Sequence, residues 1–551
     1  MVYCGKPSRG CQMCRTRRIK AATLLMSVSL QCDETKPTCN QCAKSRRQCP
    51  GYKDEFDLLL RNETKATERR AKKAGKKIAT EKGVGLDQMS APSGSPTSSR
   101  LSPTFQGAVK SPLDLSIIPA LEIPAETHAS CHFVSNFVLV PRQGSTRGFL
   151  DYLVPLLKTE RADSQIQHAF NACALASLGN RVSSPRIDFS GRAHDEYIKA
   201  ISATNIALRD PEASKSDATL AAVLLMGMFE NITASRPADF AWGSHIEGAI
   251  LITKARGRKQ LRTKTGLLLF VAVRTQLTVL ALSAAKAPSM GADWWLNDAV
   301  KDESATACQR INLKTGELRA EVTRIMTTLA RTPENTDLVL AMIRRAQLLD
   351  QEAVGWMRSV PEPWHYKTLC WEDHVPNGDY SKAEVFPGRV DVYNDFWIAS
   401  VWNLTRATRL VLASLTVRCA AWVCSPVDYR TTPEYATASQ TCVDMITDII
   451  ASVPYHLGWH TKRKHLFRSM ELSGFACGEE DSTKALPGYF LSWPLACVVS
   501  QDYITDAQRQ WVAGRLRYIG DELGLRYAHI LTKLELRIPS MLIRLDAFAA
   551  Q

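Results

Sequence analysis

The residues with the clearest capacity for chemistry are six cysteines near the amino terminus. They follow the spacing C-x2-C-x17-C-x6-C-x2-C-x6-C and are Cys11, Cys14, Cys32, Cys39, Cys42 and Cys49. Cysteine thiolates bind zinc, which takes four sulfur ligands in a tetrahedral arrangement. Six sulfurs are too many for one ion, and they fill the eight ligand positions of two ions if two sulfurs bridge. The spacing therefore predicts a site for two Zn²⁺ ions.

The two halves of this motif read "CQMCRTRRIK" and "CDETKPTCNQCAKSRRQC". Both resemble the fungal six-cysteine binuclear zinc cluster transcription factors, whose pattern is C-x2-C-x6-C-x5–12-C-x2-C-x6–8-C with a basic run after the second cysteine. The resemblance implies two bridging ligands, Cys11 and Cys39, and two further ligands for each ion: Cys14 with Cys32, and Cys42 with Cys49.

The basic run predicts contact with double-stranded DNA. A short helical turn that metal ligation fixes at both ends fits the major groove, where guanidinium groups bond guanine edges. In the family the positions of Arg17 and Arg18 read a CGG-type triplet. Phosphate contacts are expected from the other basic residues, which are Arg15, Lys20, Lys44, Arg46 and Arg47. For Lys44 or Arg47 taken alone, a solvated surface charge is an equally good interpretation.

Residues 21–31, "AATLLMSVSLQ", depart from the family, which has six residues between its second and third cysteines where this chain has seventeen. The longer loop costs about 0.9 kcal/mol of closure entropy, against roughly 10–16 kcal/mol for structural zinc. Zinc binding is therefore expected to survive. We expect the insert to impair DNA binding more than zinc binding, because its apolar side chains would protrude beside the recognition turn. The simplest interpretation is that these residues are translated non-coding sequence.

The distribution of charge predicts that this module binds nucleic acid, and the cysteine usage predicts a reducing compartment. The chain has a net charge of +14, and residues 1–82 hold 20 Lys and Arg against 8 Asp and Glu. A basic segment joined to a nearly neutral remainder is typical of a DNA-binding module attached to a larger domain. The nine later cysteines are scattered singly in apolar surroundings, as expected of reduced thiols in the cytosol or nucleus. We expect a nuclear protein.

Composition divides the chain into three parts. Residues 1–53 form the expected zinc cluster module. Residues 54–124 are expected to be a disordered linker, first basic and then Ser/Pro-rich in "SAPSGSPTSSRLSPTF". No heptad pattern supports a coiled coil there. Residues 125–551 show amphipathic and apolar helical stretches and few alternating strands, which predicts a mainly α protein with a large all-α domain.

Within 125–551, the stretches 164–180, 216–231 and 395–424 each predict a helix, and 508–535 predicts a pair of helical stretches. The apolar window 266–285 contains Arg274 and Gln276 near its centre, which favours a buried helix over a membrane span. This part of the chain also resembles the fungus-specific regulatory domain that accompanies these zinc clusters. The residues that carry this resemblance are Phe229-Glu230-Asn231, Trp242, His245, Gly248-Ala249, Arg256-Gly257, Trp493-Pro494-Leu495 and Trp511.

Three functional hypotheses follow. The first is a zinc-dependent, sequence-specific transcription factor whose partners are DNA and the transcription machinery or co-regulators, with a homodimer possible and no membrane contact. The second is an interaction-only protein or negative regulator whose DNA binding the 21–31 insert impairs. The third, an enzyme or ligand sensor, has no catalytic motif behind it, and we assign no catalytic residue. His245 is interpreted as a packed, hydrogen-bonded structural side chain.

Overall fold

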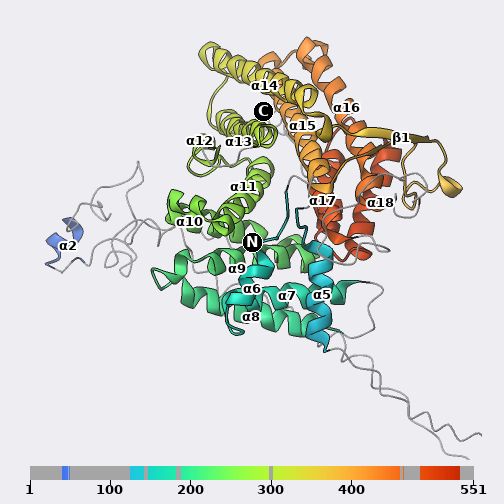
Figure 1. The fold of residues 1–551 in the computed structure, drawn as a ribbon. Coiled ribbons are helices and arrows are strands. Elements are labelled where there is room, and N and C mark those ends of the chain that lie inside the picture. Colours follow the sequence, from blue (N-terminus) through green and yellow to red (C-terminus); the bar gives the residue numbers. More distant parts are fainter. Residues whose placement is uncertain are drawn as a thin grey trace, which may run out of the picture. The chain divides into compact units, whose positions relative to one another are not determined.

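A computed structural model describes residues 40–46, 49, 124–141, 147–181, 188–296, 302–459, 463 and 484–533. The chain divides into two units, residues 1–69 and residues 70–551. Of the described elements, the first unit contains the short helix α2 (Asn40–Lys44). All the others belong to the second unit, which we call the body (Figure 1). The predicted zinc ligands and basic residues outside the described ranges are Cys11, Cys14, Cys32, Cys39, Arg15, Arg17, Arg18, Lys20 and Arg47.

The amino-terminal part of the body is a group of helices packed around α7 and α9. The helices are α5 (Ala125–Phe137), α6 (Leu153–Thr159), α7 (Gln165–Asn180), α8 (Ser190–Ala207), α9 (Asp217–Thr233) and α10 (Trp242–Arg256). Helix α7 contacts α5, α8 and α9, and α9 contacts α10. Nearly every residue of α9 is buried, in agreement with its almost wholly apolar sequence.

Longer helices form the remainder of the body. They are α11 (Lys264–Ala284), α12 (Ala292–Leu296), α13 (Glu303–Thr328), α14 (Pro333–Ser359), α15 (Phe396–Cys424), α16 (Pro433–His456), α17 (Ala485–Val499), α18 (Asp506–Asp521) and α19 (Ala528–Lys533). Helix α15 is central, because it packs against α13, α14, α16 and α17. Helix α11 contacts both α10 and α13, so it links the two groups (Figure 1).

Short 3-10 helices occur among the described connections, at Ala213–Lys215, Pro237–Asp239, Gly257–Arg262, Glu362–Trp364, Pro376–Gly378 and Tyr429–Thr431.

Local sequence explains where several of these helices begin and end. The side chains of Ser164, Ser216 and Asp395 cap α7, α9 and α15 by accepting hydrogen bonds from backbone N–H groups in the first turn. Helix α10 ends at Arg256 and is followed by Gly257, whose φ of 60° favours glycine over residues with a side chain. The helices predicted over 164–180, 216–231 and 395–424 are therefore confirmed.

The body is mainly helical, as predicted, but it is not all-α. Strands β1 (Lys367–Glu372) and β2 (Gly388–Val392) form an antiparallel two-stranded sheet in which Lys367 pairs with Val392. Strand β1 is mostly exposed, and Trp371 has 75% of its surface in solvent. Because β1 buries no face, its sequence lacks the alternation of apolar and polar residues that predicts a strand. The sheet packs on the body through the contact of β2 with α16.

Helices α11 and α15 are long and apolar enough to cross a membrane by length and composition alone. In the body, 56% and 83% of their most apolar windows are buried against other helices. Arg274 of α11 is fully buried, and its Nη1 donates to the carbonyl oxygen of Trp295 at 3.2 Å. This packing is what core helices show, and it agrees with the interpretation of 266–285 as a buried helix.

The carboxyl-terminal described residues fold back onto the amino-terminal helices. The backbone N–H groups of Arg526 and Tyr527 donate to the carbonyl oxygens of Ile232 and Asn231, each at 3.2 Å. Asn180 Nδ2 donates to the carbonyl of Ile232 at 2.7 Å. These bonds fix the end of α9 beside residues 524–527, so segments about 300 residues apart in the chain border one interior region.

Candidate functional site

The described part of the zinc cluster region is the helix α2 and its flanks. Cys42 on α2 is almost fully buried, with 1% of its surface exposed, and Cys49 is half-buried. Lys44 and Arg46 are exposed, and Arg46 has a left-handed φ of 50°. One of the predicted sulfur ligands is thus withdrawn from solvent and a second is partly so, while two of the predicted phosphate-binding residues face the solvent.

Thiol sulfur is the donor that a structural zinc site uses, so Cys42 and Cys49 suit the predicted ion. The described ranges contain no group of three or more Cys, His, Asp or Glu side chains placed to hold a metal. Four of the six predicted ligands lie outside those ranges, and the zinc cluster therefore stays a prediction.

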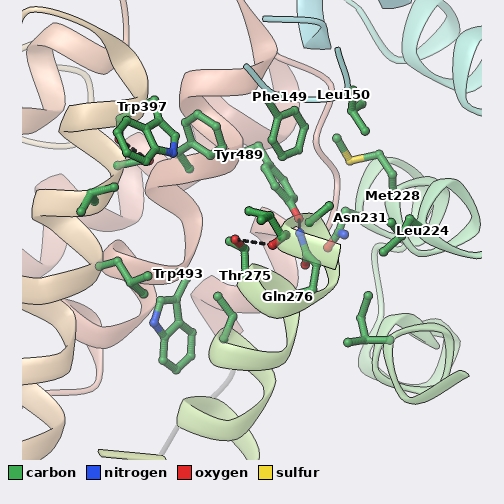
Figure 2. A pocket seen from close by; sticks show the side chains of 18 of the residues that line it. Phe149, Leu150, Leu224, Met228, Asn231, Thr275, Gln276, Trp397, Tyr489 and Trp493 are labelled. Carbon is green, nitrogen blue, oxygen red and sulfur yellow. Dashed lines mark hydrogen bonds between the residues drawn. The ribbon is translucent and has the colours of Figure 1, made fainter. Parts of the chain in front are cut away.

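A second candidate site is a cavity of about 440 Å³ inside the body. Its wall comes from residues 147–152 and from helices that include α9, α10, α11, α15 and α17. In Figure 2, Met228 of α9, Gln276 of α11 and Tyr489 of α17 lie around this space. Cavities of ~300–1,000 Å³ are typical of small-molecule sites.

Aromatic rings form part of the wall of the cavity, beside aliphatic side chains. They belong to Phe149, Tyr152, Phe240, Trp242, Trp397, Tyr489, Phe490, Trp493 and Tyr527. Phe149 and Phe490 meet edge to face with centroids 5.3 Å apart. Phe240 lies parallel to both Trp242 and Tyr527, at 6.3 and 6.0 Å. Aromatic pairs at such separations attract each other beyond their burial, so the rings of the wall hold one another in place.

Most polar groups that line the cavity are already hydrogen-bonded within the protein. Gln276 Nε2 donates to Tyr489 Oη at 3.0 Å. Asn231 Nδ2 donates to the carbonyl oxygen of Gly227 at 3.0 Å. Thr275 and Ser400 donate their hydroxyl hydrogens to carbonyl oxygens one helical turn before them, those of Val271 and Trp397.

Two lining groups differ from these. Tyr152 Oη and Trp493 Nε1 are buried and have no hydrogen-bond partner among the residues that the structure describes. Burial raises the pKa of the Tyr152 hydroxyl, with the charge of Asp151 as a further cause, so the hydroxyl stays neutral. An indole N–H can only donate. Both atoms have less than 1 Å² of accessible surface, so they lie within the wall and do not face the space of the cavity.

The charged residues that line the cavity are Arg147 and Asp151, on one short segment. Burial raises the pKa of the Asp151 carboxyl, and the positive charges of Lys264 and Arg147 oppose that rise. Because the two lining charges have opposite sign, the cavity wall has no net formal charge.

Tyr197, Glu230 and His245 form a buried hydrogen-bond network in the body. Tyr197 Oη donates to Glu230 Oε1 at 2.6 Å and lies 2.8 Å from His245 Nε2. Because the tyrosine has a single hydrogen to donate, it accepts from the histidine N–H. The backbone N–H of Ala241 donates to Glu230 Oε2 at 3.1 Å, and Phe229 stacks on Tyr197 with centroids 4.3 Å apart. His245 is thus a packed, hydrogen-bonded residue, as predicted.

This network is expected to make stability depend on pH. Burial alone raises the pKa of Glu230, but His245, whose Nε2 lies 3.9 Å from Glu230 Oε1, and the hydrogen bonds from Tyr197 and Ala241 hold it below the ordinary value of 4.5. A depressed carboxyl pKa stabilises the fold above pH 4.5, and the contribution disappears as pH falls through the lower folded value.

Glu230→Gln is therefore expected to lower the free energy of unfolding by about 1.5–3 kcal/mol at pH 7, the worth of hydrogen bonds to a charged group. The difference from the wild type should shrink as pH falls below 4.5. Urea unfolding at a series of pH values measures it, with the exposed Glu212→Gln as control. A difference that stays constant with pH contradicts the assignment.

The structure brings together several residues that carry the resemblance to a regulatory domain. Asn231, Trp242, Trp493 and Pro494 all line the cavity. Nothing in the sequence around Tyr152 or Tyr489 marks either residue as part of a cavity wall. Gln276 could be noticed in the sequence, because an amide side chain in a buried helix usually has a hydrogen-bond partner.

Comparison with known proteins points to gene regulation. Residues 130–326 match the family described as "Fungal specific transcription factor domain". The chain is similar to "Transcription factor dbaG" of Emericella nidulans, with 21% identity over 412 residues, which are 73% of this chain and 90% of the relative. It is also similar to "White-opaque regulator 2" of Candida albicans, with 41% identity over 58 residues, a tenth of each chain.

No solved structure matches this chain. The matched family and the relative that aligns over most of its length support a fungal transcription regulator.

Proposed function

We propose that this chain is a nuclear transcription factor that binds double-stranded DNA at CGG-type triplets through a module holding two zinc ions. The observation that carries the proposal is the spacing of the six cysteines, with a basic run directly after the second one. Three features support it: the similarity to transcription regulators, the basic balance of residues 1–82, and the burial of Cys42 beside the exposed Lys44 and Arg46.

Each set of residues has a distinct task in this proposal. The zinc ions, when bound to the six thiolates, cross-link a segment too short to form a hydrophobic core. Arg17 and Arg18 donate to guanine O6 and N7 in the major groove, and this contact selects the triplet. Arg15, Lys20, Lys44, Arg46 and Arg47 contact phosphates and set the register on the duplex. The helical body connects this binding to co-regulators or the transcription machinery.

An alternative function rests on the apolar insert at residues 21–31. If it blocks the recognition turn, the chain is an interaction-only protein or negative regulator. The insert holds Leu24, Leu25 and Met26 but no charged residue. Such a segment has nothing to offer a phosphate backbone, and it adds apolar surface where water and phosphate belong.

Deleting residues 21–31 separates these two functions. The shortened chain is expected to keep its zinc and to bind a CGG-containing duplex at least on the order of 10-fold more tightly, since one restored bidentate base contact is worth ~1–3 kcal/mol. Its salt dependence should be steeper by about 0.9 in log K per log salt for each phosphate contact regained. Fluorescence anisotropy titrations at two or more salt concentrations measure both quantities. Equal affinities and equal slopes show that the insert does not obstruct DNA.

A further inference from the structure

We propose that two copies of this chain associate through strand β1, whose outer edge pairs antiparallel with β1 of the second copy. Strands β1 and β2 form a two-stranded sheet, so among the described residues no strand pairs with the outer edge of β1. Figure 1 shows β1 at the rim of the body. The proposal concerns the body alone, so it stands whether or not the zinc cluster region binds DNA.

The outer edge of β1 offers backbone groups to a further strand. In an antiparallel pair, each strand directs about half of its N–H and C=O groups to its neighbour and the rest away from it. No backbone hydrogen bond joins β1 to a described segment other than β2. The pairing with β2 also passes over Leu369, which has no partner residue there. An edge of this kind is a template on which another strand can add.

The side chains of β1 leave apolar surface in solvent. Trp371 has 75% of its surface exposed, and Leu369 and Cys370 are only half-buried. Apolar and aromatic surface gains free energy when it leaves water. A strand added at the edge would cover part of these side chains, so the edge offers apolar contact as well as backbone hydrogen bonds.

The charges at the two ends of β1 identify the partner as a second copy. Lys367 and Glu372 have no ion-pair partner in the part of the chain that the structure describes. Antiparallel pairing of β1 with itself about a twofold axis places Lys367 opposite Glu372 of the second copy, and the reverse, so that two ion pairs form. Parallel pairing in register would instead set lysine against lysine and glutamate against glutamate.

The same antiparallel register matches the inner residues of the strand. Trp371 lies opposite Thr368 of the second copy, and an aromatic residue across from a β-branched one is a favourable cross-strand pair. Leu369 lies opposite Cys370 of the second copy, so apolar side chains meet at the centre. Each of these pairs occurs twice, because the interface is symmetric.

The size of the contact predicts a weak dimer. Each copy contributes a strand of six residues, with an irregularity between Thr368 and Cys370. Such a contact is smaller than the roughly 1,200–2,000 Å² that stable interfaces bury. We therefore expect an equilibrium between monomer and dimer in the micromolar range.

Sedimentation equilibrium of the full chain tests for this dimer. The mean mass should rise from 61.2 kDa towards twice that value as the concentration increases. Glu372→Lys sets a lysine against Lys367 at both ends of the interface and should weaken association at least about tenfold. Glu212→Lys, at an exposed glutamate outside the hairpin, is the charge-matched control and should change nothing. A wild type that stays monomeric, or a Glu372→Lys variant that associates as tightly as the wild type, overturns the proposal.

Exchanging the two charges tests the antiparallel register. Lys367→Glu alone should be as weak as Glu372→Lys, because it sets two glutamates against each other. The double variant carries the same charges at opposite ends, so antiparallel pairing again brings lysine against glutamate. Its association should return to within about threefold of the wild type. A double variant no tighter than the single ones overturns the register.

Amide hydrogen exchange and an apolar variant locate the interface. The β1 peptide of the wild type should take up deuterium more slowly at high than at low concentration, and Glu372→Lys should lose this difference. Trp371→Ser should weaken association about 3- to 10-fold, because the pair with Thr368 occurs twice. Val427→Ser, at a residue 70% exposed, is the control for lost apolar surface and should have no effect. Unchanged association in Trp371→Ser, or exchange in β1 that does not depend on concentration, places the contact elsewhere and overturns the proposal.

Discussion

Replacing Cys42 with alanine is expected to abolish specific DNA binding and to reduce the zinc content below two ions per chain. Cys42 is the predicted ligand that the structure shows almost fully buried on α2. Because structural zinc is worth roughly 10–16 kcal/mol in small domains, loss of one ligand should unfold the module. Affinity for a CGG duplex should then fall to the non-specific level, a loss of at least about 10³-fold. Native mass spectrometry and anisotropy titration measure the two effects.

Cys131→Ala is the matched control, because Cys131 is an exposed cysteine on α5, outside the six-cysteine pattern. It should leave zinc content and DNA affinity unchanged. The far-ultraviolet circular dichroism of both variants should equal that of the wild type, since α2 belongs to the first unit and the large helices to the second. Two bound zinc ions in Cys42→Ala would show that Cys42 is not a ligand.

Replacing Arg406 with alanine is expected to destabilise the body by about 3–5 kcal/mol, the usual cost of removing one partner from a buried ionic network. Arg406 is fully buried in α15, and its Nη1 donates to Tyr393 Oη at 2.6 Å and to Asn403 Oδ1 at 3.0 Å. Its guanidinium lies 5.0 Å from the ring centroid of Tyr366 and approaches Asp448, with Nε 3.8 Å from Oδ2. Alanine leaves these polar groups buried with fewer partners.

Urea unfolding followed by circular dichroism measures this loss. Arg161→Ala is the control, because Arg161 pairs with Asp163 at the surface, where both side chains are more than two-thirds exposed. Exposed pairs contribute ~0–1 kcal/mol. Arg406→Met fills more of the space with apolar atoms and should cost less than alanine. Equal stability of Arg406→Ala and the wild type would show that the network contributes nothing.

Much of the helical architecture could be predicted from local chemistry. Ser216 and Asp395 mark the starts of α9 and α15 because an oxygen on a short side chain can cap the first turn. The unbroken apolar run of α9 indicates an interior helix, because a helix that is apolar on all sides is stable only when it is buried on all sides. Asn403 and Arg406 lie one turn apart on α15 and are both buried, and Arg406 Nη1 donates to Asn403 Oδ1 there.

Other features could not be read locally, because they depend on contacts between distant segments. Strand β1 has an irregular pairing between Thr368 and Cys370 and buries no continuous face. The cavity wall joins residues 147–152 to α9, α11, α15 and α17. Nothing in the sequence near Trp493 shows that its N–H lacks a partner. The six-cysteine pattern is different, since its spacing alone carries the prediction, and most of that pattern lies outside the described residues.

The most direct test of the central claim is an anisotropy titration of the zinc-loaded chain, and of the form lacking residues 21–31, on two duplexes of equal length and composition. One duplex contains CGG triplets and the other has those bases permuted. The account predicts at least about 10³-fold tighter binding to the CGG duplex, lost when a chelator removes the zinc. Equal affinity for the two duplexes in both forms of the chain would contradict it.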